Sequence, residues 1–333
     1  VICPSVPGLA SRQTVEGIEV VRTRYAPRRF ETLAATGSMY REARGFRSVL
    51  VLPMIVSLIF GAVRESRRHN VIAFHGHWWI PGGLVGVVAG FVTRTQSVVH
   101  LHGSDAFVTS SFLMRWLFRR VARSATYCLA VSSSLARWGE NLSGREVSIC
   151  PMPLSEDFNN PILAPPSGGP LLAVGRLVYE KGFDLLVEAV SLLNESQRPL
   201  IVIVGSGPER DPLIEQAKRL NVDIELPGAI SPKKVYEWYQ KSSLVVVPSR
   251  REGFGLVAAE AAATGRAVIG TRVGGIPDVV DHGVSGLIVE PSNSRALATA
   301  IKTLDIDWGL LGPAHVEQLS QPSHAIFLKN LYD

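Results

Sequence analysis

The stretch 248–265, PSRREGFGLVAAEAAATG, combines glycines with an expected helix start in a way that can bind an anionic ligand. Gly253 and Gly255 allow a ligand to approach the backbone on either side of Phe254, and a helix of small residues is expected to begin at Leu256. The start of a helix presents unpaired N–H groups and a partial positive charge, which favours a phosphate by about 0.3–2 kcal/mol. The segment therefore predicts an anion site.

Two carboxylates flank this site, with seven residues between them. Glu260 lies in an alanine-rich helix that is apolar nearly all round, so its carboxylate must accept hydrogen bonds. Vicinal ribose hydroxyls are suitable donors. Glu252, which precedes the helix start, is placed to accept from the hydroxyls of a sugar attached to the phosphate. The alternative is that Glu260 only pairs with an arginine or caps a loop.

Two cations five residues apart follow another expected strand, in LLAVGRLVYEKGFDLLVEAV at 171–190. Arg176 offers a planar fork of donors and Lys181 a point charge, a pair suited to a diphosphate. GSGP, which begins at Gly205, is either a tight turn or part of the same site. The loop that ends at Ile230 can meet a nucleobase through its backbone groups.

Short apolar strands alternate with helical stretches in both halves of the chain, which predicts parallel sheets covered on both faces. In such sheets ligands bind at the carboxyl ends of the strands, where the polar residues collect here. We therefore expect an α/β protein with two doubly wound Rossmann-like domains facing a cleft. Strands are expected at 71–74, 97–101, 126–131, 171–174, 200–204, 223–226, 244–247 and 267–270, and helices of the second half at 184–193, 208–220, 232–241 and 256–264.

The domain boundaries follow from length and from a proline-rich segment. A chain of 333 residues that is 46% apolar is too long for one ordinary core and too apolar to be disordered. The predicted organisation is an N-terminal Rossmann-like domain at 1–160, a linker at 161–170, a C-terminal ligand-binding domain at 171–320 and a terminal helix at 321–333. The apolar run 48–63 is interpreted as a buried helix in preference to a membrane-surface helix.

The net charge of +5 is unevenly distributed. Residues 1–160 contain 18 Arg, no Lys and 10 acidic residues, whereas the remainder is mildly acidic. This half is interpreted either as facing an anionic partner, such as a phosphate-linked acceptor or an acidic membrane surface, or as an Arg-rich solvated surface. No basic-aromatic interleaving indicates nucleic acid. The three cysteines indicate a reducing compartment, and we expect a cytoplasmic protein or one peripheral at the inner membrane face.

The second half resembles the donor domain of GT-B glycosyltransferases, specifically glycosyltransferase family 4. The G-R-x(4)-K-G loop corresponds to 175–182, the E-x(7)-E segment to 252–260 and the V-G-G-I-P-E-V-V stretch to 273–280, where Asp278 replaces Glu. The resemblance implies that Arg176 and Lys181 bind the donor diphosphate, and that Glu260 binds the ribose and Glu252 the transferred sugar. Further donor contacts would come from the backbone at Phe254, Gly255 and Leu256.

The first half is similar to the same family at two loops. An H-G-x-D-like loop begins at His102 and ends at Asp105, and the resemblance implies that His102 meets the donor sugar near the reacting carbon. HWWIPGG contains His77 and Trp78, whose rings either stack on an acceptor or pack on the following helix. The family begins with a strand, a glycine-rich loop and a helix, and we expect about one such unit to be missing ahead of VICP.

Family members retain the anomeric configuration, so the resemblance implies a retaining hexosyltransferase with a nucleotide-diphosphate sugar as donor and a saccharide or lipid-linked acceptor, in cell-surface polysaccharide or glycolipid synthesis. No cofactor and no metal are expected, because two cations and a helix start neutralise the departing diphosphate. The alternatives are an inverting transferase with His102 or Asp105 as base, an epimerase or hydrolase of the same fold, and a non-catalytic nucleotide-sugar binding protein. A nicotinamide oxidoreductase is disfavoured because no G-x-G-x-x-G follows a strand.

Overall fold

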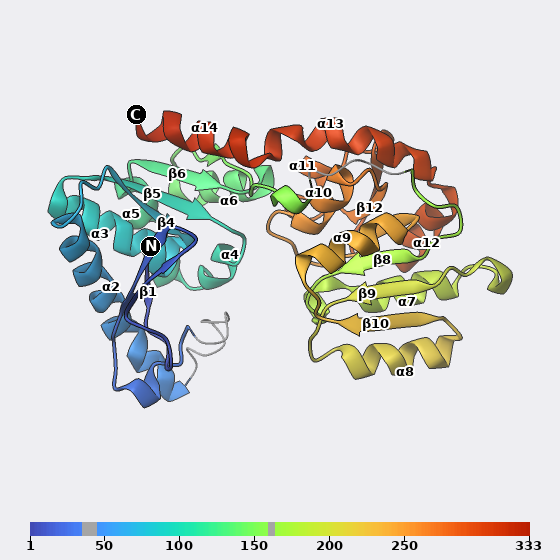
Figure 1. Ribbon diagram of the computed structural model, residues 1–333, viewed down its shortest axis with the longest axis horizontal. Helices are drawn as coiled ribbons and strands as arrows, with labels where there is room; N and C mark the ends of the chain where they lie inside the picture. The colour runs from blue at the N-terminus through green and yellow to red at the C-terminus, as the bar shows by residue number, and fades with distance from the viewer. Residues whose placement is uncertain (35–44, 159–163) are drawn as a thin grey trace. The chain divides into compact units, whose positions relative to one another are not determined.

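The computed structural model describes residues 1–34, 45–158 and 164–333, which form two compact units (Figure 1). The first unit contains Val1–Leu129, Trp138–Ser148 and Tyr332, and the second contains Ala130–Arg137, Ile149–Leu331 and Asp333. The second unit thus takes in segments that the boundaries predicted from sequence assign to the first domain. Of the predicted linker, 161–163 lie outside the described residues, and 164–170 contain neither helix nor strand.

A small three-stranded sheet opens the first unit. Strand β1 (Ile2–Pro4) pairs in parallel with β3 (Ile18–Thr23), and β2 (Arg12–Val15) pairs with β3 in antiparallel fashion. The β2–β3 hairpin was not predicted, because its strands are largely polar and its turn is Glu16-Gly17. Both turn residues have positive φ, at 49° and 80°, as tight hairpin turns require.

The main sheet of the first unit has four strands in the order β4 (Ala73–His77), β5 (Gln96–Leu101), β6 (Tyr127–Ala130) and β7 (Ser148–Ile149). Strands β4 and β5 are parallel, with His77 opposite His100. The helices that accompany these strands are α2 (Val51–Ser66), the irregular turn η3 (Trp78–Gly83), α3 (Leu84–Thr93), α4 (Asp105–Val108), α5 (Phe112–Ser124) and α6 (Ser133–Ser143). Helix α2 packs against α3 over a core that includes Met54, Leu58 and Ala89.

The prediction of a buried helix at 48–63 holds for only one face of α2. Leu58 is buried, but Leu52, Val56 and Phe60, spaced four residues apart, are exposed, Phe60 by 73%. By length and composition alone, the helical stretch Arg47–Ser66 could cross a membrane, and about a third of its most apolar window is buried within the protein.

The second unit is built on a six-stranded sheet in the order β10-β9-β8-β11-β12-β13. Every strand pairs in parallel with its neighbours. Numbered within the unit, this order is 3-2-1-4-5-6, the Rossmann order, in which ligands bind beyond the carboxyl ends of the two strands where the order reverses. Those two strands are β8 (Leu171–Val174) and β11 (Leu244–Val247); the others are β9 (Ile201–Val204), β10 (Ile224–Gly228), β12 (Val268–Thr271) and β13 (Gly286–Val289).

Helices pack on this sheet because its central strands are apolar on both faces. All residues of β9 and β11 are buried, and the core continues onto α7 (Phe183–Ser191), α8 (Arg210–Leu220) and α12 (Ser294–Thr303). The other helices of the unit are α9 (Pro232–Lys241), α10 (Leu256–Ala263), α11 (Ile276–Val279), α13 (Gly312–Val316) and α14 (Gln321–Tyr332). Short 3-10 turns lie at Arg28–Phe30, Gly45–Leu50, Glu156–Phe158, Tyr179–Lys181, Glu195–Gln197, Ile306–Leu311 and Glu317–Leu319.

Candidate functional site

The two motif loops of the second unit follow β8 and β11, the strands on either side of the reversal. They touch through Gly182, which has a φ of +68° and lies so close to the Pro248 carbonyl that a Cβ would sit 2.1 Å from its oxygen. Lys181 Nζ donates to Glu252 Oε2 at 2.7 Å across this junction. Two residues that the sequence assigned to different parts of a ligand therefore form an ion pair here.

Glu252 is held from a second direction within its own loop. Ser249 Oγ donates to Glu252 Oε2 at 3.1 Å, and Thr271 Oγ1 from β12 donates to the Ser249 carbonyl at 2.6 Å. The side chains of Lys181 and Glu252 are 20% and 15% exposed, so the pair is accessible from solvent. Arg176, earlier on the loop after β8, is exposed.

An unpredicted arginine ties the two loops together. Arg250 Nη1 and Nη2 donate to Asp184 Oδ1 and Oδ2 at 2.7 and 2.6 Å, and the guanidinium carbon lies 4.1 Å from the ring centroid of Tyr179. The hydrogen bond to Asp184 raises the pKa of Arg250. This bidentate pair joins the loop after β11 to the first turn of α7, and so fixes the position of Glu252 relative to Lys181.

Helix α10 begins at the predicted residue, next to this pair. Gly255 is its N-cap residue, with a φ of +97°, and none of the described side chains caps the helix. A Cβ at Gly255 would lie 3.1 Å from the Ile276 side chain, so glycine is required both by conformation and by space. Phe254 is buried and Leu256 is exposed at this helix start, which stays the predicted anion site.

Glu260 accepts a hydrogen bond from a residue that the sequence did not reveal. The hydroxyl of Tyr239, a fully buried side chain of α9, donates to Glu260 Oε2 at 2.9 Å. Burial raises the pKa of Glu260 to about 7, while the Tyr239 hydrogen bond acts in the opposite direction. The carboxyl group therefore titrates near neutral pH, and hydroxyl donors on a ligand would favour its charged form.

The family usually has a residue followed by Pro where this chain has Arg266-Ala267, and the resemblance predicts that this departure alters only a turn. In the structure, Arg266 supports Tyr239. Its fully buried guanidinium donates through Nε to the Tyr239 carbonyl at 2.7 Å and through Nη2 to the Gln240 carbonyl at 3.2 Å. Burial lowers the pKa of this arginine. The C-terminal end of α9 is thereby anchored beside α10.

The predicted donor-binding residues Gly205 and Ile230 have different surroundings. Gly205 lies so close to the loop after β8 that a Cβ would sit 1.8 Å from the Gly175 carbonyl oxygen. This close approach gives Gly205 a backbone role in positioning the Arg176 loop, consistent with the tight-turn interpretation. Ile230 is partly buried in the loop after β10, and among the described residues no hydrogen bond joins it to the Lys181–Glu252 pair.

In the first unit, Asp105 organises the loop after β5. It is fully buried, Oδ1 accepts from the Trp79 N–H at 2.7 Å, and Oδ2 accepts from the N–H groups of His102 and Gly103 at 2.6 and 3.2 Å. Burial raises its pKa, and these backbone hydrogen bonds oppose the rise. With both oxygens occupied, Asp105 is poorly placed to act as a general base.

His102, His77 and Trp78 lie together beside this loop. His102 Nε2 and His77 Nδ1 are 2.8 Å apart, and the Trp78 ring is tilted against His102 with centroids 5.5 Å apart. Burial lowers the pKa of His102 to about 3, with further contributions from His77 and His75. The ring is therefore neutral at pH 7, and it can donate or accept one hydrogen bond at a reacting sugar. The following Trp79 is fully buried, with its ring edge-on to Phe118.

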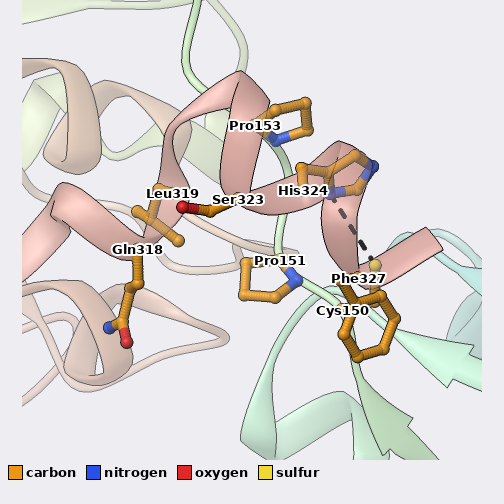
Figure 2. Close-up of a pocket in the computed structure, with 8 residues that line it drawn as sticks. All are labelled: Cys150, Pro151, Pro153, Gln318, Leu319, Ser323, His324 and Phe327. Atoms are coloured by element: carbon orange, nitrogen blue, oxygen red, sulfur yellow. Dashed lines mark hydrogen bonds between the residues drawn. The ribbon is translucent and has the colours of Figure 1, made fainter. Parts of the chain in front are cut away.

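A cavity of about 170 Å³ elsewhere in the second unit has different chemistry (Figure 2). Cys150 Sγ and His324 Nδ1 are 3.8 Å apart in it. Burial raises the pKa of Cys150 to about 11 and lowers that of His324, so the pair consists of a neutral thiol and a neutral imidazole. Nucleophilic catalysis needs a thiolate, which burial disfavours at Cys150.

Solved structures with the same arrangement of elements define the class. Sucrose-phosphate synthase from Thermosynechococcus elongatus gives a TM-score of 0.75 at 21% identity, covering 99% of this chain and 86% of that one. HepE from Anabaena, in complex with UDP and glucose, gives 0.69 at 19% identity, covering 95% and 86%. The fold is therefore GT-B, an α/β architecture with two Rossmann-like domains.

Sequence comparisons assign the family. Residues 157–311 match Glycosyl transferases group 1, and residues 1–154 match the Glycosyl transferase 4-like domain. An uncharacterized glycosyltransferase of Methanocaldococcus jannaschii is 31% identical over 244 residues, 72% of this chain and 66% of the relative. The putative teichuronic acid biosynthesis glycosyltransferase TuaC of Bacillus subtilis is 30% identical over 240 residues, 68% and 59% respectively. The matches span less than two thirds of each of these relatives. The two family matches together span most of the chain, which belongs to the group 1, family 4 glycosyltransferases.

Proposed function

We propose that this protein is a retaining glycosyltransferase that moves a sugar from a nucleotide-diphosphate sugar to an acceptor hydroxyl, in cell-surface polysaccharide or glycolipid synthesis. One observation carries the proposal: Lys181 and Glu252 meet at 2.7 Å where the Rossmann strand order reverses, beside the uncapped start of α10. The HepE structure is a complex with UDP and glucose, and the name of TuaC links that relative to teichuronic acid biosynthesis. Both relatives agree with this substrate class.

The ion pair suggests how the site receives its donor. A diphosphate competes with Glu252 for Lys181, because it offers a larger negative charge to the same ammonium group. Once released, Glu252 accepts hydrogen bonds from the hydroxyls of the transferred sugar. Arg176, Lys181 and the start of α10 then neutralise the charge that grows on the departing diphosphate. No residue is required as a covalent nucleophile, and a diphosphate oxygen takes the acceptor proton.

Replacing the ammonium group tests this role. Lys181→Ala should abolish transfer and leave the fold intact, because the side chain is partly exposed and its partner Glu252 keeps the Ser249 hydrogen bond. Lys218→Ala, on the last turn of α8, is the matched control and should keep full activity. Wild-type turnover of Lys181→Ala would overturn the assignment.

The donor and the stereochemistry are determined one after the other. Thermal stabilisation by UDP-, GDP- and ADP-sugars identifies the nucleotide, since a ligand at 100 times its Kd stabilises the folded state by about 2.7 kcal/mol. The anomeric configuration of the product then distinguishes retention from inversion. Donor consumption without acceptor would indicate a hydrolase or epimerase, and binding without turnover would indicate a non-catalytic protein.

We also propose that the protein is cytoplasmic and contacts an anionic membrane surface through α5. Phe112 is 86% exposed, and Trp116 is exposed one turn further on. Arg119, Arg120 and Arg123 continue along the helix towards its C-terminus. An exposed aromatic end followed by arginines is typical of a helix that lies at a lipid interface, and such a position would bring a lipid-linked acceptor near the enzyme.

Vesicle binding tests this second part. Each basic side chain near an anionic surface contributes about 1 kcal/mol, so Arg119→Gln with Arg120→Gln should weaken binding to phosphatidylglycerol vesicles by roughly 30-fold. Lys218→Gln with Arg219→Gln, on α8 of the second unit, is the control, because it also removes two exposed positive charges. Equal binding to neutral phosphatidylcholine vesicles, or no effect of the double substitution, would rule out this surface.

A further inference from the structure

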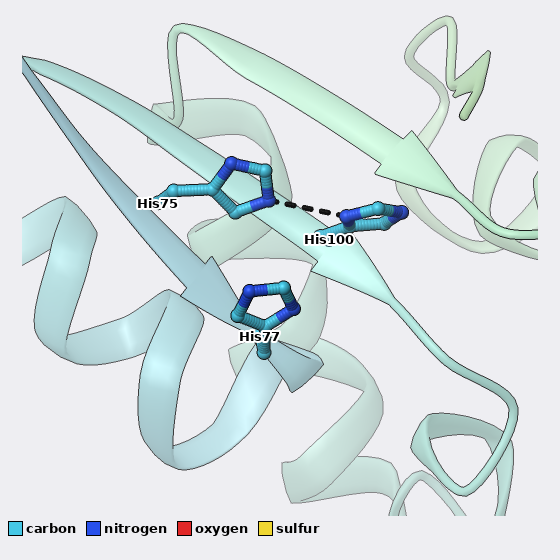
Figure 3. A group of neighbouring side chains, drawn as sticks. All are labelled: His75, His77 and His100. Atoms are coloured by element: carbon cyan, nitrogen blue, oxygen red, sulfur yellow. Dashed lines mark hydrogen bonds between the residues drawn. The ribbon is translucent and has the colours of Figure 1, made fainter. Parts of the chain in front are cut away.

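Two neighbouring strands of the first unit each end in a His-x-His pattern. His75 and His77 lie on β4, and His100 lies on β5 with His102 two residues later. Alternate residues of a strand point to the same face, and the parallel register sets His77 opposite His100. The rings of His75, His77 and His100 consequently converge on one face of the sheet, where Figure 3 shows them turned toward one another.

The spacing of the ring nitrogens suits a metal ion. One nitrogen of each of the three rings lies within 4.8 Å of the others, and His75 Nε2 and His100 Nδ1 are 3.1 Å apart. In a tetrahedral zinc site with Zn–N distances of about 2.0–2.1 Å, neighbouring donor nitrogens are about 3.3 Å apart. The distance between His75 Nε2 and His100 Nδ1 is thus already close to that of a zinc site. Small ring rotations would bring the His77 nitrogen to a similar distance from the other two.

Surrounding groups orient these rings as metal ligands require. The Tyr332 hydroxyl, which belongs to the same compact unit, hydrogen-bonds to His75 Nδ1 and leaves Nε2 directed at His100. His77 Nδ1 pairs with His102 Nε2, and His100 is only 1% exposed. Metal-bound imidazoles regularly use their second nitrogen in such a hydrogen bond, which fixes the tautomer.

We propose that His75, His77 and His100 bind one divalent ion of the zinc class. Three imidazoles with no carboxylate favour Zn²⁺ and its transition-metal neighbours over Mg²⁺ or Ca²⁺, and three protein ligands leave a fourth position open for water or a ligand. The three histidines belong to the first unit, whereas Lys181 and Glu252 belong to the second, where no metal is expected. It goes beyond the proposed transfer function, although the His77–His102 hydrogen bond links it to the predicted acceptor side.

The experiment measures metal directly on the full chain, prepared without a histidine tag. After chelation and dialysis, mass-spectrometric metal analysis and titration with Zn²⁺ should give one tightly bound equivalent per chain. His75→Gln and His77→Gln should each weaken binding by about 100-fold or more, since each removes a ligand. The Co²⁺-substituted protein should have the absorption spectrum of a tetrahedral nitrogen site, and both variants should lose it.

A second group with metal-binding residues provides the control. Glu19, Glu65 and His69 also cluster, but Glu65 is bound to Arg12 at 2.6 Å, and His69 is exposed. His69→Gln should therefore bind Zn²⁺ as the wild type does. Loss of zinc in His69→Gln, or undiminished zinc binding in both His75→Gln and His77→Gln, would overturn the proposal. Failure of the folded wild type to bind zinc would do the same.

The outcome is independent of the transfer reaction. Lys181→Ala should retain one equivalent of zinc even though its transfer activity is lost. A protein that binds zinc through these histidines but transfers no sugar would refute the proposed function alone. One that transfers sugar without binding zinc would refute this inference alone.

Discussion

Removing the Tyr239 hydroxyl should change the ionisation of Glu260 by an amount that the structure allows us to calculate. Tyr239→Phe deletes the donor that lies 2.9 Å from Glu260 Oε2 and leaves the ring in place. A hydrogen bond to a charged group contributes about 1.5–3 kcal/mol, and one pKa unit corresponds to about 1.36 kcal/mol. The pKa of Glu260 should therefore rise from about 7 by roughly 1–2 units.

The ligand affinity should follow this shift. If charged Glu260 accepts from ribose hydroxyls, Tyr239→Phe should weaken binding of the nucleotide identified by thermal stabilisation about tenfold at pH 7.5, where the carboxyl of the variant is mostly protonated, and much less above pH 9. Calorimetry between about pH 6.5 and 9.5 measures this affinity across the pH range in which Glu260 of the variant loses its proton. Tyr236→Phe is the matched control on the same helix, because the Tyr236 hydroxyl accepts from Gln240 and not from Glu260.

The same shift has a definite sign in protein stability. The folded-state pKa of Glu260 lies above its ordinary value of 4.5, so between these values the folded protein holds a proton that the unfolded chain has lost. The free energy of unfolding consequently decreases as pH rises from about 4.5 to 7, and in Tyr239→Phe the decrease should continue to about pH 8–9. Unchanged pH profiles of both nucleotide affinity and urea denaturation in this variant would refute the reasoning.

Three further substitutions test the loops. Gly182→Ala should destabilise the fold by more than the roughly 1–2 kcal/mol that an alanine in the left-handed conformation costs, because its Cβ would lie 2.1 Å from the Pro248 carbonyl oxygen. It should also lower nucleotide affinity; urea denaturation measures the first effect and calorimetry the second. Arg250→Met should lower the free energy of unfolding in urea by about 1–2 kcal/mol, a value reduced for solvent screening because the Asp184 side chain is 39% exposed. It should reduce transfer activity by more than this loss of stability explains. Asp105→Asn should cost about 1–3 kcal/mol, since an amide nitrogen cannot accept the N–H groups now bound; an unchanged melting temperature would contradict this.

The elements of the second unit were predictable where local signals were complete. The sequence predicted β11 and α9 with the observed limits, because β11 is a short run of buried apolar residues and α9 begins with Pro232 at its first turn. The motif loops follow β8 and β11 as expected. The strand order was not predicted, since nothing in the local pattern says which strands pair.

The residues that complete the candidate site escaped prediction because their partners are distant in sequence. Arg250 and Asp184 are 66 residues apart, Tyr239 and Glu260 are 21 apart, and a solvated side chain would have produced the same local pattern. The His-x-His spacing of β4 and β5 was a usable signal, but only the register of the two strands brings those rings together. The β2–β3 hairpin was missed although its strands are adjacent in sequence, because their many polar residues resemble a loop.

Arg266 connects a sequence departure to the chemistry of the site. The resemblance suggested that replacing the family's usual residues there affects only a turn, yet its guanidinium holds the Tyr239 carbonyl, and the Tyr239 hydroxyl in turn binds Glu260. A buried arginine is tolerable only where hydrogen-bond acceptors surround it, and the carbonyls at the end of α9 supply them. Arg266 lies two residues before β12, so its hydrogen bonds fix the end of α9 to the start of β12. The position of the Glu260 carboxylate therefore depends on residues outside the predicted ligand contacts. A substitution at Arg266 should therefore displace Tyr239 and, through its hydrogen bond to Glu260, change the nucleotide affinity.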